Sequence, residues 1–134
     1  MLNPFPDLLT FSLLAPFFLR VMLGIFYLRF GYLKLTKDKE AKIRFFEDIR
    51  LKPGIAFVWV FGLLEALGGI LLIAGLFTQI VSLVLGMVML GAIIVKLRNK
   101  DALPNDPEFY ILLFVATCSL LFSGAGAFAF DLPL

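Results

Sequence analysis

The chain has 134 residues, of which 61% are hydrophobic and 16 are Phe; since a soluble domain of this length cannot bury so much apolar surface, we expect an integral membrane protein in contact with lipid. Its single Cys excludes an internal disulfide or a CxxC redox pair, and the absence of His argues against a His-ligated haem or zinc, so we expect no metal and no cofactor held by the protein's own ligands. The formal charge is only +2, and we expect no nucleic-acid partner.

Four apolar segments predict an all-α, four-helix membrane bundle that forms a single domain over residues 1–134. They run over about 8–35, 55–78, 80–97 and 108–124. Pro16 marks a kink or an N-terminal break in the first segment. A short turn at Thr78 and Gln79 joins the second to the third, and the loop with Pro104 and Pro107 precedes the fourth.

The basic residues predict the orientation. Segments 34–52 and 96–107 hold ten of the twelve Lys and Arg residues. The positive-inside rule therefore places these loops in the cytoplasm and both termini on the extracytoplasmic side of the cell (inner) membrane. Segment 1–7 has no Lys or Arg, so we expect the first apolar run to be retained and not cleaved as a signal.

Within the first basic loop, residues 37–50 mix charges with Ile and Phe at a spacing that predicts a short helix. Its apolar edge suits contact with the inner membrane surface, where it would dock anionic lipid or a partner. Alternatively, the segment is a solvated connector that also fixes the topology.

Glu65 lies near the middle of the otherwise uncharged run 55–78. A carboxylate at this depth costs on the order of a few kcal/mol unless it is paired. Arg20 lies at a similar depth when both are counted from the outer ends of their segments. Because those segments are antiparallel, we predict an Arg20–Glu65 salt bridge or a shared hydrogen-bond network. Arg29 is close enough to the cytoplasmic end to extend its charge to the interface.

Small residues share helix faces with these charges and allow backbones to approach closely. We expect helix packing at Gly24, Gly31, Gly62, Gly68 and Gly69.

The resulting polar patch has two interpretations. It is either an inert ion pair that fixes helix register, or a pocket in which Arg20 and Glu65, with Tyr27 and Trp59, contact a quinone head group, an acid or a proton. Cys118 is interpreted as a small membrane hydrophobe and not as a nucleophile.

Three motifs, taken in order, resemble the DoxX family of small four-helix bacterial and archaeal membrane proteins. They are LRVMLG at 19–24, with Gly31 and Lys34 following; EALGGILL at 65–72, continuing to GLFT at 75–78; and LFSGAG at 121–126, with Asp131 following. The similarity covers nearly the whole chain. Two positions depart from the family pattern: Phe30 stands where relatives often have His, and Gln79 stands where they often have Arg.

The resemblance implies a link to redox chemistry. Some relatives are subunits of thiosulfate:quinone oxidoreductase, and others belong to membrane oxidoreductase assemblies that respond to oxidative or thiol stress. The polar residues that match the family motif are Arg20, Lys34, Glu65 and Asp131.

We therefore expect a DoxX-like subunit of a larger redox or quinone-linked membrane complex. It would be structural or quinone-contacting and not catalytic by itself, with the lipid bilayer and other membrane subunits as partners and a quinone or lipid as its ligand. Two alternatives remain open. One is a small solute or proton transporter that uses Arg20 and Glu65; the other is a membrane-protein assembly factor that acts through the basic inner loop.

Overall fold

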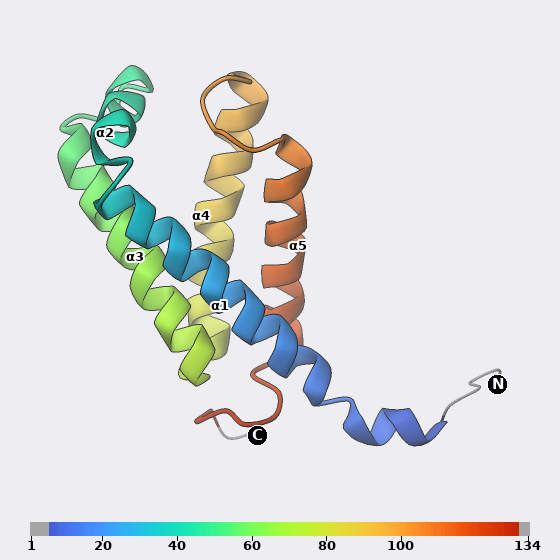
Figure 1. The fold of residues 1–134 in the computed structure, drawn as a ribbon. Coiled ribbons are helices and arrows are strands. Elements are labelled where there is room, and N and C mark those ends of the chain that lie inside the picture. Colours follow the sequence, from blue (N-terminus) through green and yellow to red (C-terminus); the bar gives the residue numbers. More distant parts are fainter. Residues whose placement is uncertain (1–5, 132–134) are drawn as a thin grey trace.

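The computed structural model describes residues 6–131, and this part of the chain is entirely helical apart from its turns and loops. The expectation of an all-α fold is confirmed for these residues (Figure 1). In chain order the elements are a 3-10 helix η1 (Pro6–Phe11) and the helices α1 (Leu14–Leu35), α2 (Lys39–Asp48), α3 (Gly54–Ala74), α4 (Thr78–Arg98) and α5 (Pro107–Ser123).

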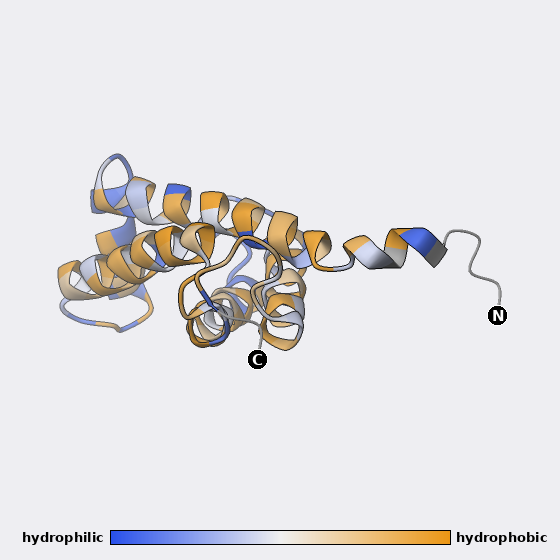
Figure 2. Cartoon of the chain, turned by 90° about the horizontal axis from the view of Figure 1, so that it is seen from below, coloured by the Kyte–Doolittle hydropathy of each residue, from blue (hydrophilic) through white to orange (hydrophobic). Residues whose placement is uncertain are grey.

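Three helices, α1, α3 and α4, have the length and apolar composition needed to cross a bilayer. The apolar helix α5 is shorter, with 17 residues. Large apolar side chains such as Leu67 and Met87 are exposed on these helices, and Figure 2 shows that hydrophobic residues predominate along the long helices. That surface suits contact with lipid chains and not with water.

The first long helix begins later than the sequence predicts. It starts at Leu14 instead of residue 8, and Pro16 lies in its first turn, where a missing backbone N–H costs no helical hydrogen bond. Residues from Pro6 to Phe11 form the separate helix η1. Arg20 therefore lies only about 9 Å along α1 from its N-terminal end.

The predicted turn at Thr78 and Gln79 is wrong, because Thr78 is already the first residue of α4. The turn occupies residues 75–77. Gly75 has a left-handed backbone (φ 72°), and the N–H groups of Gly75 and Leu76 both donate to the carbonyl oxygen of Leu71. A left-handed glycine at this place is a standard helix ending, and it stops α3 there.

Helices α1 and α3 pack against each other through glycines. A Cβ atom added to Gly24 would lie 2.7 Å from the carbonyl oxygen of Gly69, and one added to Gly31 would lie 2.5 Å from that of Gly62. Gly68 instead faces α4. The two backbones are thus in direct contact, and only glycine fits between them.

The short helix expected in the basic loop is present as α2. The Phe46 ring is buried, and its centroid lies 5.5 Å from that of the Phe61 ring and 6.0 Å from that of the Phe57 ring of α3. Phe46 therefore packs α2 against α3.

Candidate functional site

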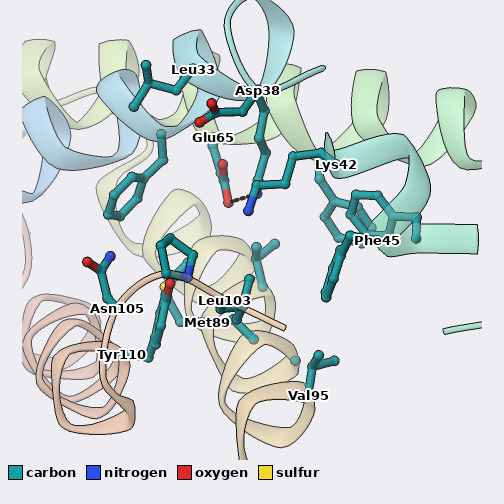
Figure 3. Close-up of a pocket in the computed structure, with 18 of the residues that line it drawn as sticks. Leu33, Asp38, Lys42, Phe45, Glu65, Met89, Val95, Leu103, Asn105 and Tyr110 are labelled. Atoms are coloured by element: carbon teal, nitrogen blue, oxygen red, sulfur yellow. Dashed lines mark hydrogen bonds and ion pairs between the residues drawn. The ribbon is translucent and has the colours of Figure 1, made fainter. Parts of the chain in front are cut away.

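The buried carboxylate of Glu65 is paired with Lys34. Glu65 lies near the middle of α3, and Lys34 lies in the last turn of α1. The Lys34 Nζ atom is 2.5 Å from Glu65 Oε1, with the Lys side chain 18% exposed and the Glu side chain 1% exposed. Figure 3 marks this ion pair with a dashed line.

The predicted Arg20–Glu65 salt bridge is wrong. Arg20 is fully buried near the N-terminal end of α1, and its Nη2 donates to the carbonyl oxygens of Ala127 and Phe128, at 3.3 and 3.0 Å. The depth comparison failed because it placed the start of the first helix at residue 8. With α1 beginning at Leu14, Arg20 reaches the tail that follows α5 and not the middle of α3.

Asp131 makes a second contact that holds the tail, close to Arg20. Its carboxylate accepts hydrogen bonds from the backbone N–H groups of Phe77 and Thr78, at 2.7 and 2.6 Å, at the start of α4. Burial alone would raise the pKa of Asp131, but these hydrogen bonds and the charge of Arg20 outweigh it, so the pKa is lowered. The tail is thereby fixed across the N-terminal part of α1, the C-terminal end of α3 and the start of α4.

Tyr27 and Trp59 do not join Glu65. The Tyr27 hydroxyl is fully buried and lies 2.7 Å from Thr117 Oγ1, so it connects α1 to α5. Trp59 is 43% exposed on α3, and the Lys39 ammonium lies 5.0 Å from its ring centroid. The four-residue polar patch predicted from the sequence is therefore divided among separate places.

A cavity of about 680 Å³ lies beside the Lys34–Glu65 pair. Helices α1 to α5 and the loop between α4 and α5 all contribute to its walls. Its aromatic lining includes Phe26, Phe30, Phe45, Phe61 and Phe109. Figure 3 shows Glu65 on one side of the cavity and Asn105 and Tyr110 on the opposite side. This volume and the mostly apolar lining with a few polar groups are typical of small-molecule sites.

The family comparison agrees with the motifs. The DoxX family profile matches residues 15–97, which include Arg20, Lys34 and Glu65. The chain belongs to the DoxX family. It is also 34% identical over 113 residues to "Putative oxidoreductase CatD" of Bacillus subtilis (strain 168), an alignment that covers 84% of this chain and 81% of that protein. No solved structure matches the chain.

With three long apolar helices, this DoxX protein is a multi-pass membrane protein. Its four family-motif polar residues form two clusters. Lys34 and Glu65 lie at the cavity, whereas Arg20 and Asp131 fix the tail at the opposite end of the bundle. The cavity is therefore the place where this DoxX chain combines a buried charge pair with open volume.

Sequence reasoning did not identify Lys42, Asn105 or Tyr110 as lining residues of this cavity. Burial lowers the pKa of Lys42 on α2, and the nearby charge of Lys34 lowers it further. The two ammonium groups therefore lie near one another at the cavity wall. The charged segment 37–50 carried a signal for Lys42, but only the packing of α2 on α3 shows which of its charges faces the cavity.

Proposed function

We propose that this DoxX protein is an integral membrane subunit of a redox complex and that its cavity contacts a quinone. In this proposal α5 crosses the membrane with α1, α3 and α4, and both termini lie on the extracytoplasmic side. The observation that carries the proposal is a buried Lys34–Glu65 pair at the wall of an aromatic cavity.

The lining of the cavity suits the chemistry of a quinone. The flat, apolar ring favours contact with Phe side chains, and the Lys34 ammonium is positioned to donate a hydrogen bond to a ring carbonyl oxygen. The cavity volume of about 680 Å³ lies within the range of sites for small molecules. The apolar walls would also accept the first part of an isoprenoid tail.

The chain's composition favours an accessory role. It contains one Cys and no His, so a redox centre beyond the quinone would be held by a partner protein. At the outer end Phe122, Phe128 and Phe130 are 85%, 82% and 75% exposed. These rings offer an apolar surface to lipid or to another membrane subunit.

The arrangement of the helices supports the proposed orientation. Helix α2 and the loop between α4 and α5 lie at one end of the bundle, while η1 and the tail after α5 lie at the other (Figure 1). The two basic segments therefore share one end, as the positive-inside rule requires of cytoplasmic loops. Because both segments line the cavity, the cavity would lie toward the cytoplasmic side.

The experiment that tests this function starts with purification from the native membrane in a mild detergent. The absorption spectrum, the co-purifying proteins and the solvent-extracted quinone are then measured. We expect a stable assembly with haem- or flavin-containing subunits and quinone in near-stoichiometric amount. A colourless, solitary protein without quinone would contradict the proposal.

A further inference from the structure

Only one of the two carboxylate oxygens of Glu65 has a hydrogen-bond partner. Oε1 accepts from Lys34, but Oε2 is buried, and no group within residues 6–131 donates to it. A buried acceptor without a donor is unfavourable, and more so when it is charged. The free oxygen of Glu65 therefore has no donor among residues 6–131.

Glu65 belongs to the lining of the cavity. Lys42, Asn105 and Tyr110 also line it, and none of them forms a hydrogen bond with Glu65 Oε2. Because Glu65 belongs to the cavity wall, a molecule bound in the cavity can supply that donor. Water can fill this role in the empty protein, and a ligand hydroxyl would replace that water without losing the hydrogen bond.

Quinones and quinols differ in whether they can donate a hydrogen bond to Glu65 Oε2. A quinone ring has two carbonyl oxygens, which only accept hydrogen bonds. A quinone carbonyl oxygen placed next to Glu65 Oε2 would therefore be repelled by the carboxylate. A quinol ring has two hydroxyl groups, which donate. Lys34 donates equally well to a carbonyl or a hydroxyl oxygen, so Lys34 does not separate the two forms, whereas Glu65 does.

Resting on the proposed quinone contact, we infer that Glu65 makes the cavity selective for the reduced, hydroxyl-bearing form of its ligand. The hydroxyl of the quinol donates to Oε2 while Lys34 continues to hold Oε1. A hydrogen bond to a charged group justifies an expected preference for quinol over quinone of roughly tenfold. That preference raises the midpoint potential of the bound two-electron couple by about 30 mV.

The test measures the binding of decylubiquinone and of its reduced form, decylubiquinol, to the full chain in lipid nanodiscs under anaerobic conditions. Equilibrium dialysis gives the dissociation constant of each form. We expect the wild-type protein to bind the quinol roughly tenfold more tightly. In Glu65→Gln the amide both donates and accepts, so the two forms should bind with nearly equal affinity.

Two further variants locate the effect. Ala92→Phe adds a ring to the cavity wall and should weaken the binding of both forms, even if Glu65→Gln does not fold. Glu40→Gln removes an exposed carboxylate on α2 and should leave the ratio unchanged.

The outcomes separate this inference from the proposed function. If both forms bind the wild-type protein equally, or the quinone binds more tightly, selectivity is refuted but quinone contact stands. If neither form binds, both ideas fail. Affinities for both forms that are unchanged in Ala92→Phe would place the ligand outside the cavity and would also overturn the inference.

Discussion

Lys34 Nζ lies 2.5 Å from Glu65 Oε1 and joins the C-terminal end of α1 to the middle of α3. Side chains on a helix tilt toward its N-terminus, so the Lys34 stem is directed back along α1, toward the level of Gly31. At that level Gly31 packs against Gly62 and Ala66, next to Glu65. The helix crossing therefore sets the position of both charges.

The first prediction concerns the energetic coupling of this pair. Replacing Lys34 by Met leaves Glu65 buried without a counter-charge, and we expect a loss of about 3–5 kcal/mol in unfolding free energy. The double variant Lys34→Met/Glu65→Met removes both charges and should recover much of that loss. Denaturant titration in detergent of the single and double variants gives the coupling energy, which should exceed about 1 kcal/mol.

The matched control is the same double-variant cycle with Arg20 in the place of Lys34. Because Arg20 binds tail carbonyls and not Glu65, the effects of Arg20→Met and Glu65→Met should add to within about 0.5 kcal/mol. Strong coupling between Arg20 and Glu65, with none between Lys34 and Glu65, would show that the charges are paired differently.

The second prediction concerns the contact between α1 and α3. A Cβ atom at Gly31 would lie 2.5 Å from the backbone nitrogen of Ala66, so Gly31→Ala must push the helices apart. We expect a destabilisation of about 1–3 kcal/mol, measured by thermal unfolding in detergent.

The control for this prediction is Gly91→Ala on α4. A Cβ atom at Gly91 meets nothing within 4 Å, and alanine favours a helix over glycine by up to about 1 kcal/mol. Gly91→Ala should therefore be neutral or slightly stabilising. Equal losses at Gly31 and Gly91 would contradict the glycine-mediated packing.

The third prediction concerns the pH dependence of the tail. Docking lowers the pKa of Asp131, so its contribution is complete above the pKa of a free Asp, about 3.9, and is lost as the pH falls through the lower, docked value. A nitroxide at Phe130→Cys, in a Cys118→Ser background, should be held at pH 7 and gain mobility progressively as the pH falls below the pKa of a free Asp.

Asp131→Ala serves as the comparison, because it removes both acceptors at the start of α4. Loss of a helix cap costs typically about 1 kcal/mol, so the undocked population of the tail should rise roughly fivefold at pH 7. A nitroxide signal that does not change with pH or with this substitution would refute the role of Asp131.

The fourth prediction concerns orientation. In the Cys118→Ser background, a membrane-impermeant maleimide should label Asp7→Cys in intact cells and Lys100→Cys only after permeabilisation. Both native residues are exposed, so access depends on the side of the membrane. Labelling in the reverse order would overturn the proposed topology and would place the cavity toward the other side.

Most of the fold followed from the sequence because long apolar runs and Gly and Pro positions report directly on helices and their ends. The errors lie where a boundary depends on local backbone geometry. Because Gly75 has a left-handed backbone, the turn lies at residues 75–77 and not at Thr78 and Gln79. Because α1 starts at Leu14, Arg20 lies nearer to the N-terminal end of the helix than expected. A shift of a few residues at one helix end was enough to assign the wrong partner to Glu65.

The site was less accessible to sequence reasoning. Glu65 stood out because a carboxylate in an apolar run needs a partner. Lys34 was identified as a candidate only because it matches the family motif. The pairing depends on the register of α1 against α3, which the Gly31–Gly62 contact sets. The cavity also needs α2 and the loop between α4 and α5, whose positions no periodic pattern specifies.

The most direct test of the central claim is photolabelling of the purified protein in nanodiscs with an azidoquinone, followed by mass spectrometry of the digest. The account predicts adducts on cavity residues such as Phe30, Leu103 and Phe109, suppressed by excess decylubiquinone and weakened in Ala92→Phe. Adducts confined to lipid-facing positions such as Leu67 and Ile70, unaffected by competitor, would contradict it.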